Sequence, residues 1–182
     1  MKIRTDDATL IRKTTQGDHK AYARLVRRHY KTCFQLAWRQ TLSTADAEDI
    51  CQTVFIRIWQ RPDKFKPDMN TAFTTWLYRV TLNACTDFKR KFNRQFQDTK
   101  HEINAVAPDN SKNLESQLAV KAALQKLSDS QRQVINLFYF EDLSTKDIAQ
   151  ILKITPKAVE SHLRRARKTL KPFLTEFYQA AS

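Results

Sequence analysis

The sequence of 182 residues contains a single glycine, which makes several kinds of fold and binding site improbable. Tight β-hairpins and glycine-rich phosphate loops depend on glycine, because it adopts backbone conformations that strain other residues. Long apolar runs are also missing, so no segment is predicted to span a membrane. The N-terminal stretch MKIRTDDATLIRK has no apolar core after its basic residues and therefore does not predict a signal peptide. We expect a cytoplasmic protein without membrane insertion.

Cysteines and catalytic patterns are sparse as well. Cys33, Cys51 and Cys85 are odd in number and far apart, which favours buried thiols in a reducing compartment over a disulfide framework. No Cys-x-x-Cys pair or cysteine–histidine cluster predicts a metal site, and no carboxylate pair or nucleophile–base set predicts catalysis. His29 and His162 are interpreted as structural or surface residues. We expect a protein that is not an enzyme and needs no cofactor or metal.

Acidic residues are outnumbered by basic ones, with 19 Asp and Glu against 32 Lys and Arg, a net charge of +13 and a pI near 9.9. Such an excess implies an anionic partner, which is a nucleic acid, an acidic protein or a membrane surface. Hydrophobic residues make up 41% of the chain, enough for a folded core. The length suits one ordinary domain or two small ones.

Helical periodicity runs through the sequence, and no strand pattern is present. Gly17 is placed to end a first helix, and Asp18 to cap a second that reaches about Leu42. Pro62 follows the end of a third. The predicted helices cover residues 8–16, 18–42, 45–60, 73–94, 114–126, 128–140, 144–152 and 156–171.

Five of these helices carry apolar stripes, which are the predicted core. The stripes are Leu25, Val26, Cys33, Phe34 and Ala37, then Ile50, Cys51, Val54, Ile58 and Trp59, then Phe73, Trp76, Leu77, Val80, Ala84 and Phe88, then Ile148, Ala149 and Leu152, then Val159, Leu163, Ala166 and Leu170. Residues 97–112, QDTKHEINAVAPDNSK, are polar and lack helical periodicity, which predicts a linker. The predicted fold is all-α, with two small helical domains, residues 1–96 and 113–182, joined by a flexible linker.

The stretch from Leu143 to Lys171 predicts a helix-turn-helix. Thr155 is placed to cap the second helix, and Pro156 takes the first helical position, where its missing N–H costs nothing. Turns of this kind often carry glycine, but Lys153 stands here. The outward face of the second helix is mostly basic, which suits entry into a DNA major groove. The alternative is a solvated amphipathic helix that packs on a bundle. The outward residues are Lys157, Glu160, Ser161, Arg164, Arg165 and Lys168.

A second basic region ends the fourth helix, at NACTDFKRKFNR. Its cations lie near aromatic side chains in the sequence, a combination that suits single-stranded nucleic acid, whose bases stack on rings. The cations are Lys89, Arg90, Lys91 and Arg94, and the aromatic residues are Phe65, Phe73, Trp76 and Tyr78. The alternative for Phe73 and Trp76, which we favour, is that they belong to the core.

Three segments carry a resemblance to the sigma-70 family of RNA polymerase sigma factors. DAEDICQTVFIRIW resembles the polymerase-docking helix of that family, and FTTWLYRVTLNACTDFKRK resembles its promoter-melting and minus-ten-reading helix. The stretch LSDSQRQVINLFYFEDLSTKDIAQILKITPKAVESHLRRARKTLK is similar to its minus-thirty-five-reading domain. The short chain points to the extracytoplasmic-function subfamily. Lys153 and the stretch DFKRKFN depart from the family pattern, which often has glycine and more arginine there.

The resemblance implies an alternative sigma factor that binds core RNA polymerase and directs promoter-specific initiation. It implies polymerase contacts at Asp46, Asp49 and Gln52. It implies minus-ten contacts at Lys66, Asn70, Thr71, Asn83, Asp87, Lys89 and Arg90. It implies minus-thirty-five contacts at Thr155, Pro156, Lys157, Glu160, Ser161, Arg164, Arg165 and Lys168. The implied partners are core polymerase, promoter DNA as duplex and melted strand, and an anti-sigma factor.

Two other classes stay open at this point. One is a stand-alone helix-turn-helix regulator, which would bind DNA without polymerase, although the chain shows no dimer segment or effector domain. The other is a basic enzyme or membrane-surface protein, which would need exposed bulky apolar residues on an amphipathic helix.

Overall fold

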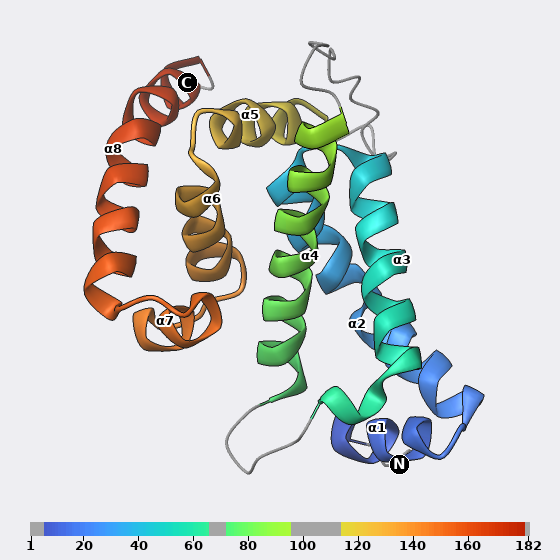
Figure 1. The fold of residues 1–182 in the computed structure, drawn as a ribbon. Coiled ribbons are helices and arrows are strands. Elements are labelled where there is room, and N and C mark those ends of the chain that lie inside the picture. The colour runs from blue at the N-terminus through green and yellow to red at the C-terminus, as the bar shows by residue number, and fades with distance from the viewer. Residues whose placement is uncertain (1–5, 66–71, 96–113, 181–182) are drawn as a thin grey trace, which may run out of the picture. The chain divides into compact units, whose positions relative to one another are not determined.

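The computed structural model describes residues 6–65, 72–95 and 114–180 of the chain. Every regular element in these ranges is helical (Figure 1), which confirms the predicted all-α class. The elements are α1 (Asp7–Thr15), α2 (His19–Thr41), α3 (Thr44–Gln60), the 3₁₀ turn η1 (Pro62–Lys64), α4 (Phe73–Gln95), α5 (Leu114–Gln125), α6 (Asp129–Ile135), the π-helical turn η2 (Asn136–Phe140), α7 (Thr145–Leu152) and α8 (Pro156–Ala180).

The chain divides into two compact units, which confirms the prediction of two small helical domains. The first comprises Met1–Ala37 and Ala45–His101, and the second comprises Trp38–Thr44 and Glu102–Ser182. The predicted linker, residues 97–112, lies outside the described residues.

The junction of α1 and α2 forms as the sequence predicts. Gly17 has a φ of +84°, a left-handed conformation that a side chain would strain. Asp18 then caps α2, because its Oδ1 accepts hydrogen bonds from the amides of Lys20 at 2.8 Å and Ala21 at 3.0 Å. The Ala21 bond is the largest of the effects that hold the pKa of Asp18 below its usual range.

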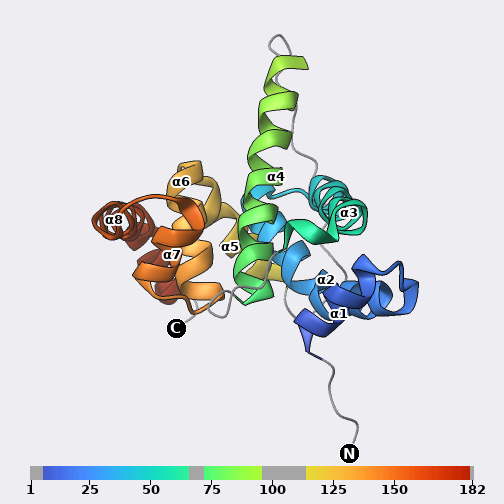
Figure 2. The same cartoon turned by 60° about the horizontal axis from the view of Figure 1, so that its bottom comes forward.

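Helices α2, α3 and α4 pack together and form the core of the first unit (Figure 1 and Figure 2). The Tyr22 hydroxyl of α2 donates to the Phe55 carbonyl of α3 at 2.9 Å. Cys33 of α2 contacts the Cys51 thiol at 3.5 Å and the Thr81 hydroxyl of α4 at 3.4 Å. All three cysteines of the chain are buried and none is in a disulfide, as predicted.

The predicted apolar stripes are correct in part. Several buried residues were not in them: Leu36, Phe55, Leu82 and Cys85. Several stripe residues are only half-buried: Val26, Phe34, Trp59, Trp76, Val80 and Phe88. The reason is that each helix of this unit contacts more than one neighbour, so its buried face is wider than a single stripe. On α4 this face includes Thr81, which contacts α2.

In the second unit, α6, α7 and α5 pack on α8, and η2 contacts α6 and α7. Ser128 and Gln131 form a capping box at the start of α6, because the Gln131 amide donates to the Ser128 hydroxyl and the Ser128 amide donates to the Gln131 side chain. The segment predicted as a helix over 128–140 is helical from Asp129 on, but α6 ends at Ile135 and the last part, Asn136–Phe140, is a π-helical turn that was not predicted. In the part of the chain that the structure describes, no helix is both long and apolar enough to cross a bilayer.

Candidate functional site

Helices α7 and α8 are joined by a tight turn, and each step of that turn depends on a specific residue. Ser144 caps α7 by accepting a hydrogen bond from the Asp147 amide at 3.2 Å. Lys153 then adopts a left-handed conformation, with φ 55° and ψ 44°. The Thr155 hydroxyl caps α8 by accepting an amide hydrogen bond at 3.2 Å, and Pro156 is the first helical residue. The predicted helix-turn-helix and its predicted cap at Thr155 are therefore confirmed.

Lys153 occupies the position of this turn where glycine would fit without strain. For a residue with a Cβ atom, the left-handed conformation is less favourable by roughly 1–2 kcal/mol. We expect Lys153→Gly to raise the free energy of unfolding by up to about 1 kcal/mol, because the greater freedom of glycine in the unfolded chain offsets part of the gain. A thermal melt measures the change. Lys146→Gly, at an exposed position in the first turn of α7, is the control and should lower stability, by less than the roughly 1 kcal/mol that glycine costs inside a helix. A melting temperature that falls in both variants would show that Lys153 is not strained.

The two sides of α8 differ sharply in exposure. Val159, Leu163 and Ala166 are buried in the unit. The residues predicted to contact the minus-thirty-five element lie at the start of the helix or on its other side. Ser161 is half-buried, and the others are exposed: Thr155, Pro156, Lys157, Glu160, Arg164, Arg165 and Lys168. The Ser161 hydroxyl accepts a hydrogen bond at 3.1 Å from the Arg165 guanidinium one turn later, which draws Arg165 along the helix surface.

Arg167 belongs to the same basic stretch but has a different environment. Its Nε donates a hydrogen bond to the Tyr139 hydroxyl at 2.8 Å. Its guanidinium lies 5.6 Å from the ring centre of Phe138 and 5.7 Å from that of Tyr139. These contacts join α8 to η2, so Arg167 is engaged in packing within the unit.

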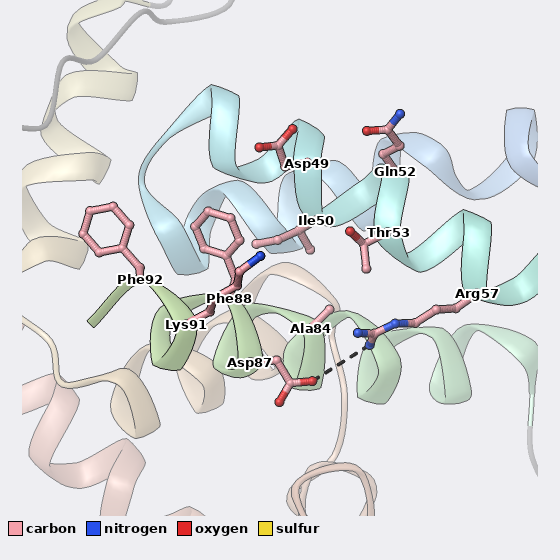
Figure 3. A pocket seen from close by; sticks show the side chains of 10 residues that line it. All are labelled: Asp49, Ile50, Gln52, Thr53, Arg57, Ala84, Asp87, Phe88, Lys91 and Phe92. Carbon is pink, nitrogen blue, oxygen red and sulfur yellow. Dashed lines mark ion pairs between the residues drawn. The ribbon is translucent and has the colours of Figure 1, made fainter. Parts of the chain in front are cut away.

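The basic end of α4 presents its polar residues to solvent. Asn83, Asp87 and Arg90 are exposed, and Lys89 is half-buried. Asp87 lies 3.9 Å from Arg57 of α3, and both side chains are largely exposed (Figure 3). A hollow on α4 brings together Asp87, Arg90, Lys91 and Arg94. Three loop residues predicted to act with them lie outside the described residues: Lys66, Asn70 and Thr71.

The aromatic residues near this helix belong largely to the core. Phe65, Phe73 and Tyr78 are buried, and Trp76 is half-buried. The rings of Phe65 and Phe73 meet edge to face with centroids 5.2 Å apart, and each lies 5.5 Å from Trp76. For Phe73 the structure supports the core alternative, whereas Trp76 keeps part of its ring accessible.

On α3, Asp49 and Gln52 are exposed, whereas Asp46 is half-buried. Ile50 and Val54 are buried on the other side of the helix. The spacing of the three polar residues therefore places two of them fully on the surface. Asp46, in the first turn, also suits the positive end of the helix dipole.

Two grooves flank the exposed face of α3, and the sequence did not reveal either. The groove toward α4 has Asp49 and Gln52 on one side and Phe88 and Phe92 on the other (Figure 3). The groove toward α2 has two large apolar residues on its surface, Tyr30 at 42% exposure and Ile56 at 45%. Neither residue lies on a predicted apolar stripe. The presence of large apolar side chains outside the stripes is the one signal in the sequence that could have indicated this exposed apolar surface.

Comparison with known proteins identifies the family. The model of Sigma-70 region 2 matches residues 25–95, and the model of Sigma-70, region 4 matches residues 117–170. The chain is 30% identical to RNA polymerase sigma factor NccH of Alcaligenes xylosoxydans xylosoxydans, in an alignment that covers 92% of this chain and 94% of NccH. The chain belongs to the sigma-70 family of RNA polymerase sigma factors.

A second relative and two solved structures define the subfamily. The sigma factor is 30% identical to ECF RNA polymerase sigma factor SigW of Bacillus subtilis, covering 91% of this chain and 95% of SigW. Among solved structures, CnrH in complex with the cytosolic domain of CnrY matches with a TM-score of 0.69 and 29% identity, over 93% of this chain and 97% of that one. RpoE in complex with the anti-sigma factor NepR from Bartonella quintana matches with a TM-score of 0.74 and 26% identity, over 86% and 98%.

The protein is thus an alternative sigma factor of the extracytoplasmic-function subfamily, which binds core RNA polymerase and directs promoter-specific initiation. The stand-alone regulator is not favoured. Region 2 contains α3, α4 and most of α2, and so all the residues predicted for polymerase and minus-ten contacts. Region 4 contains α6, α7 and the first part of α8. Helix α1 lies before both. Within the described residues, no group of histidine, cysteine and acidic side chains is suited to hold a metal ion.

Proposed function

We propose that the sigma factor divides its work between two domains, residues 1–96 and 113–182, with residues 97–112 as the linker. The first docks on core polymerase through α3 and handles the minus-ten element through α4 and the segment before it. The second reads the minus-thirty-five element through α8. The observation that carries the proposal is the face of α8, where Arg164, Arg165 and Lys168 are exposed opposite a buried apolar side. This is the arrangement that a recognition helix needs.

The residues proposed for the minus-thirty-five element divide by their place on α8. N-terminal residues of a recognition helix reach base edges, whereas later cations meet phosphates. We assign contacts with base edges to Thr155, Pro156, Lys157, Glu160 and Ser161. We assign contacts with a phosphate or a guanine to Arg164, Arg165 and Lys168.

The minus-ten proposal rests on the exposed polar face of α4. Asn83, Asp87 and Arg90 follow one another on this face at spacings of one turn, and further cations follow toward the helix end. Lys89 is half-buried and lies off this face. The loop residues Lys66, Asn70 and Thr71 complete the assignment. A melted strand would meet cations at its phosphates and place a base beside the helix.

Exchanging the loop tests the minus-ten assignment. Replacing Lys64–Thr71 with the corresponding loop of another subfamily member should change which minus-ten sequences support transcription in vitro, because bases of a melted strand are read by groups that surround them. The preference is measured on promoters that differ only in the minus-ten element. If the chimaera keeps its activity and its original preference, the readout lies elsewhere.

The polymerase proposal assigns docking to Asp46, Asp49 and Gln52 on α3. The same face has apolar surface beside it, since Tyr30 and Ile56 line the groove toward α2. Partial burial raises the pKa of the Tyr30 phenol, which is uncharged at neutral pH even at its ordinary value. Acidic residues next to exposed apolar residues suit a partner helix with both basic and apolar side chains.

Transcription in vitro tests the function as a whole. Core polymerase without any sigma factor should initiate at defined promoters of a library only when this protein is added. A footprint on the same promoters by the protein alone, without polymerase, would instead indicate a stand-alone regulator. We infer that the protein acts in the cytoplasm and catalyses no reaction of its own.

An anti-sigma factor is a further proposed partner. The structure of RpoE is a complex with an anti-sigma factor, and that of CnrH is a complex with the cytosolic domain of CnrY. By similarity, a protein of the same host should bind this sigma factor and inhibit transcription by it. Adding the purified candidate to the transcription assay measures this, and undiminished transcription in the presence of a stable complex would contradict it.

A further inference from the structure

Two buried thiols meet where α2 packs on α3. The Cys51 thiol donates a hydrogen bond to the sulfur of Cys33, with the two sulfur atoms 3.5 Å apart. The Thr81 hydroxyl of α4 lies 3.4 Å from the same Cys33 sulfur. Cys33 is 1% exposed and Cys51 is 0% exposed. Two cysteines that are 18 positions apart in the chain thus place their oxidisable groups in direct contact.

The hydrogen bonds around Cys33 favour its thiolate form. The bond from the Cys51 thiol lowers the pKa of Cys33, burial opposes this effect, and the Thr81 hydroxyl adds to the lowering. The same thiol–thiol bond raises the pKa of Cys51, which therefore stays protonated. The thiolate is the form of cysteine that attacks peroxides, and a neighbouring thiol converts the first oxidation product into a disulfide. Cys33 is thus suited to react first, and Cys51 to react second.

We propose that Cys33 and Cys51 form a peroxide-sensitive switch, in which a disulfide between α2 and α3 weakens docking on core polymerase. The effect on docking rests on the proposed function, which assigns polymerase contacts to α3. The Cys33 thiolate attacks one oxygen of hydrogen peroxide, the O–O bond breaks, and the leaving hydroxide takes up the proton that Cys33 released. The sulfenic acid on Cys33 is then attacked by Cys51, which loses its proton as the hydroxyl leaves as water. Both sulfur atoms are oxidised, and one peroxide is reduced to two waters.

Burial sets the rate of the first step and limits its product. A molecule as small as hydrogen peroxide reaches Cys33 only during local opening of the helices, so oxidation is slower than at an exposed thiolate. Once the sulfenic acid has formed, Cys51 is already in contact with it, whereas a second peroxide needs another opening. The pair therefore ends as a disulfide, which thiol reductants reverse, and not as a sulfinic acid, which they do not.

Disulfide formation alters the helices that carry the proposed docking face. An S–S bond is about 2.05 Å long, so the two sulfur atoms have to come about 1.5 Å closer. Rotation of the side chains supplies part of this movement, and α2 and α3 supply the rest, because the interior around them is close-packed. The same two helices line the groove that contains Tyr30, Asp49 and Ile56. A displacement of about 1 Å is enough to degrade a binding site.

Packing alone explains these contacts less completely. Two closely packed helices require small buried side chains, and free cysteine is among the most buried residue types. Alanine fills that role without a polar side-chain atom, as Ala37 and Ala47 do on the same two helices. Packing does not account for two hydrogen-bonding groups around one sulfur, which together favour its thiolate. If packing were the only role, peroxide should leave the cysteines as thiols or oxidise them without a fixed pairing.

Peptide mapping of the full-length protein tests disulfide formation. Trypsin separates the three cysteines, because Cys33 lies in residues 32–39, Cys51 in 40–57 and Cys85 in 80–89. After treatment with hydrogen peroxide and alkylation in denaturant, two of the three thiols should be lost. Mass spectrometry should find residues 32–39 joined to 40–57, and the cysteine of 80–89 alkylated. A dithiol reductant should restore all three thiols.

Binding to core polymerase tests the consequence. The oxidised protein, freed of peroxide, should bind core roughly five-fold more weakly or worse, and the dithiol should restore the parent affinity. Cys33→Ala and Cys51→Ala retain every other oxidisable side chain, and each should bind core equally before and after peroxide. Cys85→Ala, which removes the buried thiol of α4 and keeps the pair, is the control and should respond as the parent does.

The outcomes separate the inference from the proposed function. Three intact thiols after peroxide, or a disulfide that includes Cys85, would overturn the inference, and the parent protein alone decides this even if a variant fails to fold. Weaker binding after peroxide in Cys51→Ala would show that another side chain is responsible.

A disulfide between Cys33 and Cys51 that leaves binding to core unchanged would overturn the switch as well. Asp49→Lys, measured in parallel, then shows whether the proposed function fails with it. If Asp49→Lys loses core, docking on α3 stands and only the switch fails. If Asp49→Lys binds core as the parent does, the docking assignment fails too.

Discussion

Asp49→Lys is expected to leave the sigma factor folded and to remove most of its affinity for core RNA polymerase. Asp49 is exposed on α3 and lines the grooves on both sides of that helix. Exposed substitutions away from special features change stability by about 0.5 kcal/mol or less. At an interface with a basic partner, by contrast, the new lysine sets like charges together, at a cost of several kcal/mol. A loss of about 2 kcal/mol already weakens binding roughly thirty-fold.

A matched control separates docking from net charge. Asp63→Lys makes the same change of charge at an exposed residue of the same unit that lines neither groove. Both variants should melt near the parent temperature by circular dichroism. Only Asp49→Lys should lose core polymerase in a pull-down and transcription at every promoter. If a folded Asp49→Lys variant binds core as tightly as the parent, this face of α3 is not the docking site.

Local chemistry explains why so much of the fold could be predicted from the sequence. Gly17, Asp18, Ser128, Ser144 and Thr155 each end or begin a helix through contacts with backbone groups a few residues away. Such contacts need no knowledge of the rest of the chain. The π-helical turn after Ile135 was missed, because nothing in the stretch NLFYF distinguishes it from a continued helix.

Tertiary structure determines which residues are buried and which side chains lie together on the surface. Both were therefore predicted less well from the sequence. Leu82 and Cys85 are buried although they lie off the α4 stripe, and Trp76 is half-buried although it lies on it. The exposed face of α8 could be predicted, because one helix with one apolar stripe determines it. The apolar surface at Tyr30 and Ile56 could not, because it arises only where α2 and α3 meet.

The second large expected effect concerns the basic residues of α8. Arg164→Ala and Arg165→Ala should each weaken promoter use, and the way in which each does so shows whether that arginine contacts a guanine or a phosphate. Both side chains are exposed on the side of α8 away from its buried residues. If an arginine contacts a guanine, its loss should cost about 1–3 kcal/mol and relax specificity at one base pair. If it contacts a phosphate, its loss should weaken all sequences alike and reduce the salt dependence of binding by about one counterion. Holoenzyme binding to promoters over a range of salt concentrations measures both.

Arg167→Ala is the control that the structure supplies, because it removes the same charge from the same helix. Arg167 bonds to the Tyr139 hydroxyl and lies over two aromatic rings, so its loss should lower the melting temperature. The expected cost is about 1 kcal/mol, which is typical for one hydrogen bond and an exposed cation–π contact. The salt dependence of promoter binding should stay at the parent value, because Arg167 is engaged in packing.

Unchanged transcription by both Arg164→Ala and Arg165→Ala, at a promoter that depends on its minus-thirty-five element, would contradict the assignment of α8. A reduced salt dependence in Arg167→Ala would show that this arginine leaves Tyr139 when DNA binds. The basic face would then be wider than the unbound structure indicates.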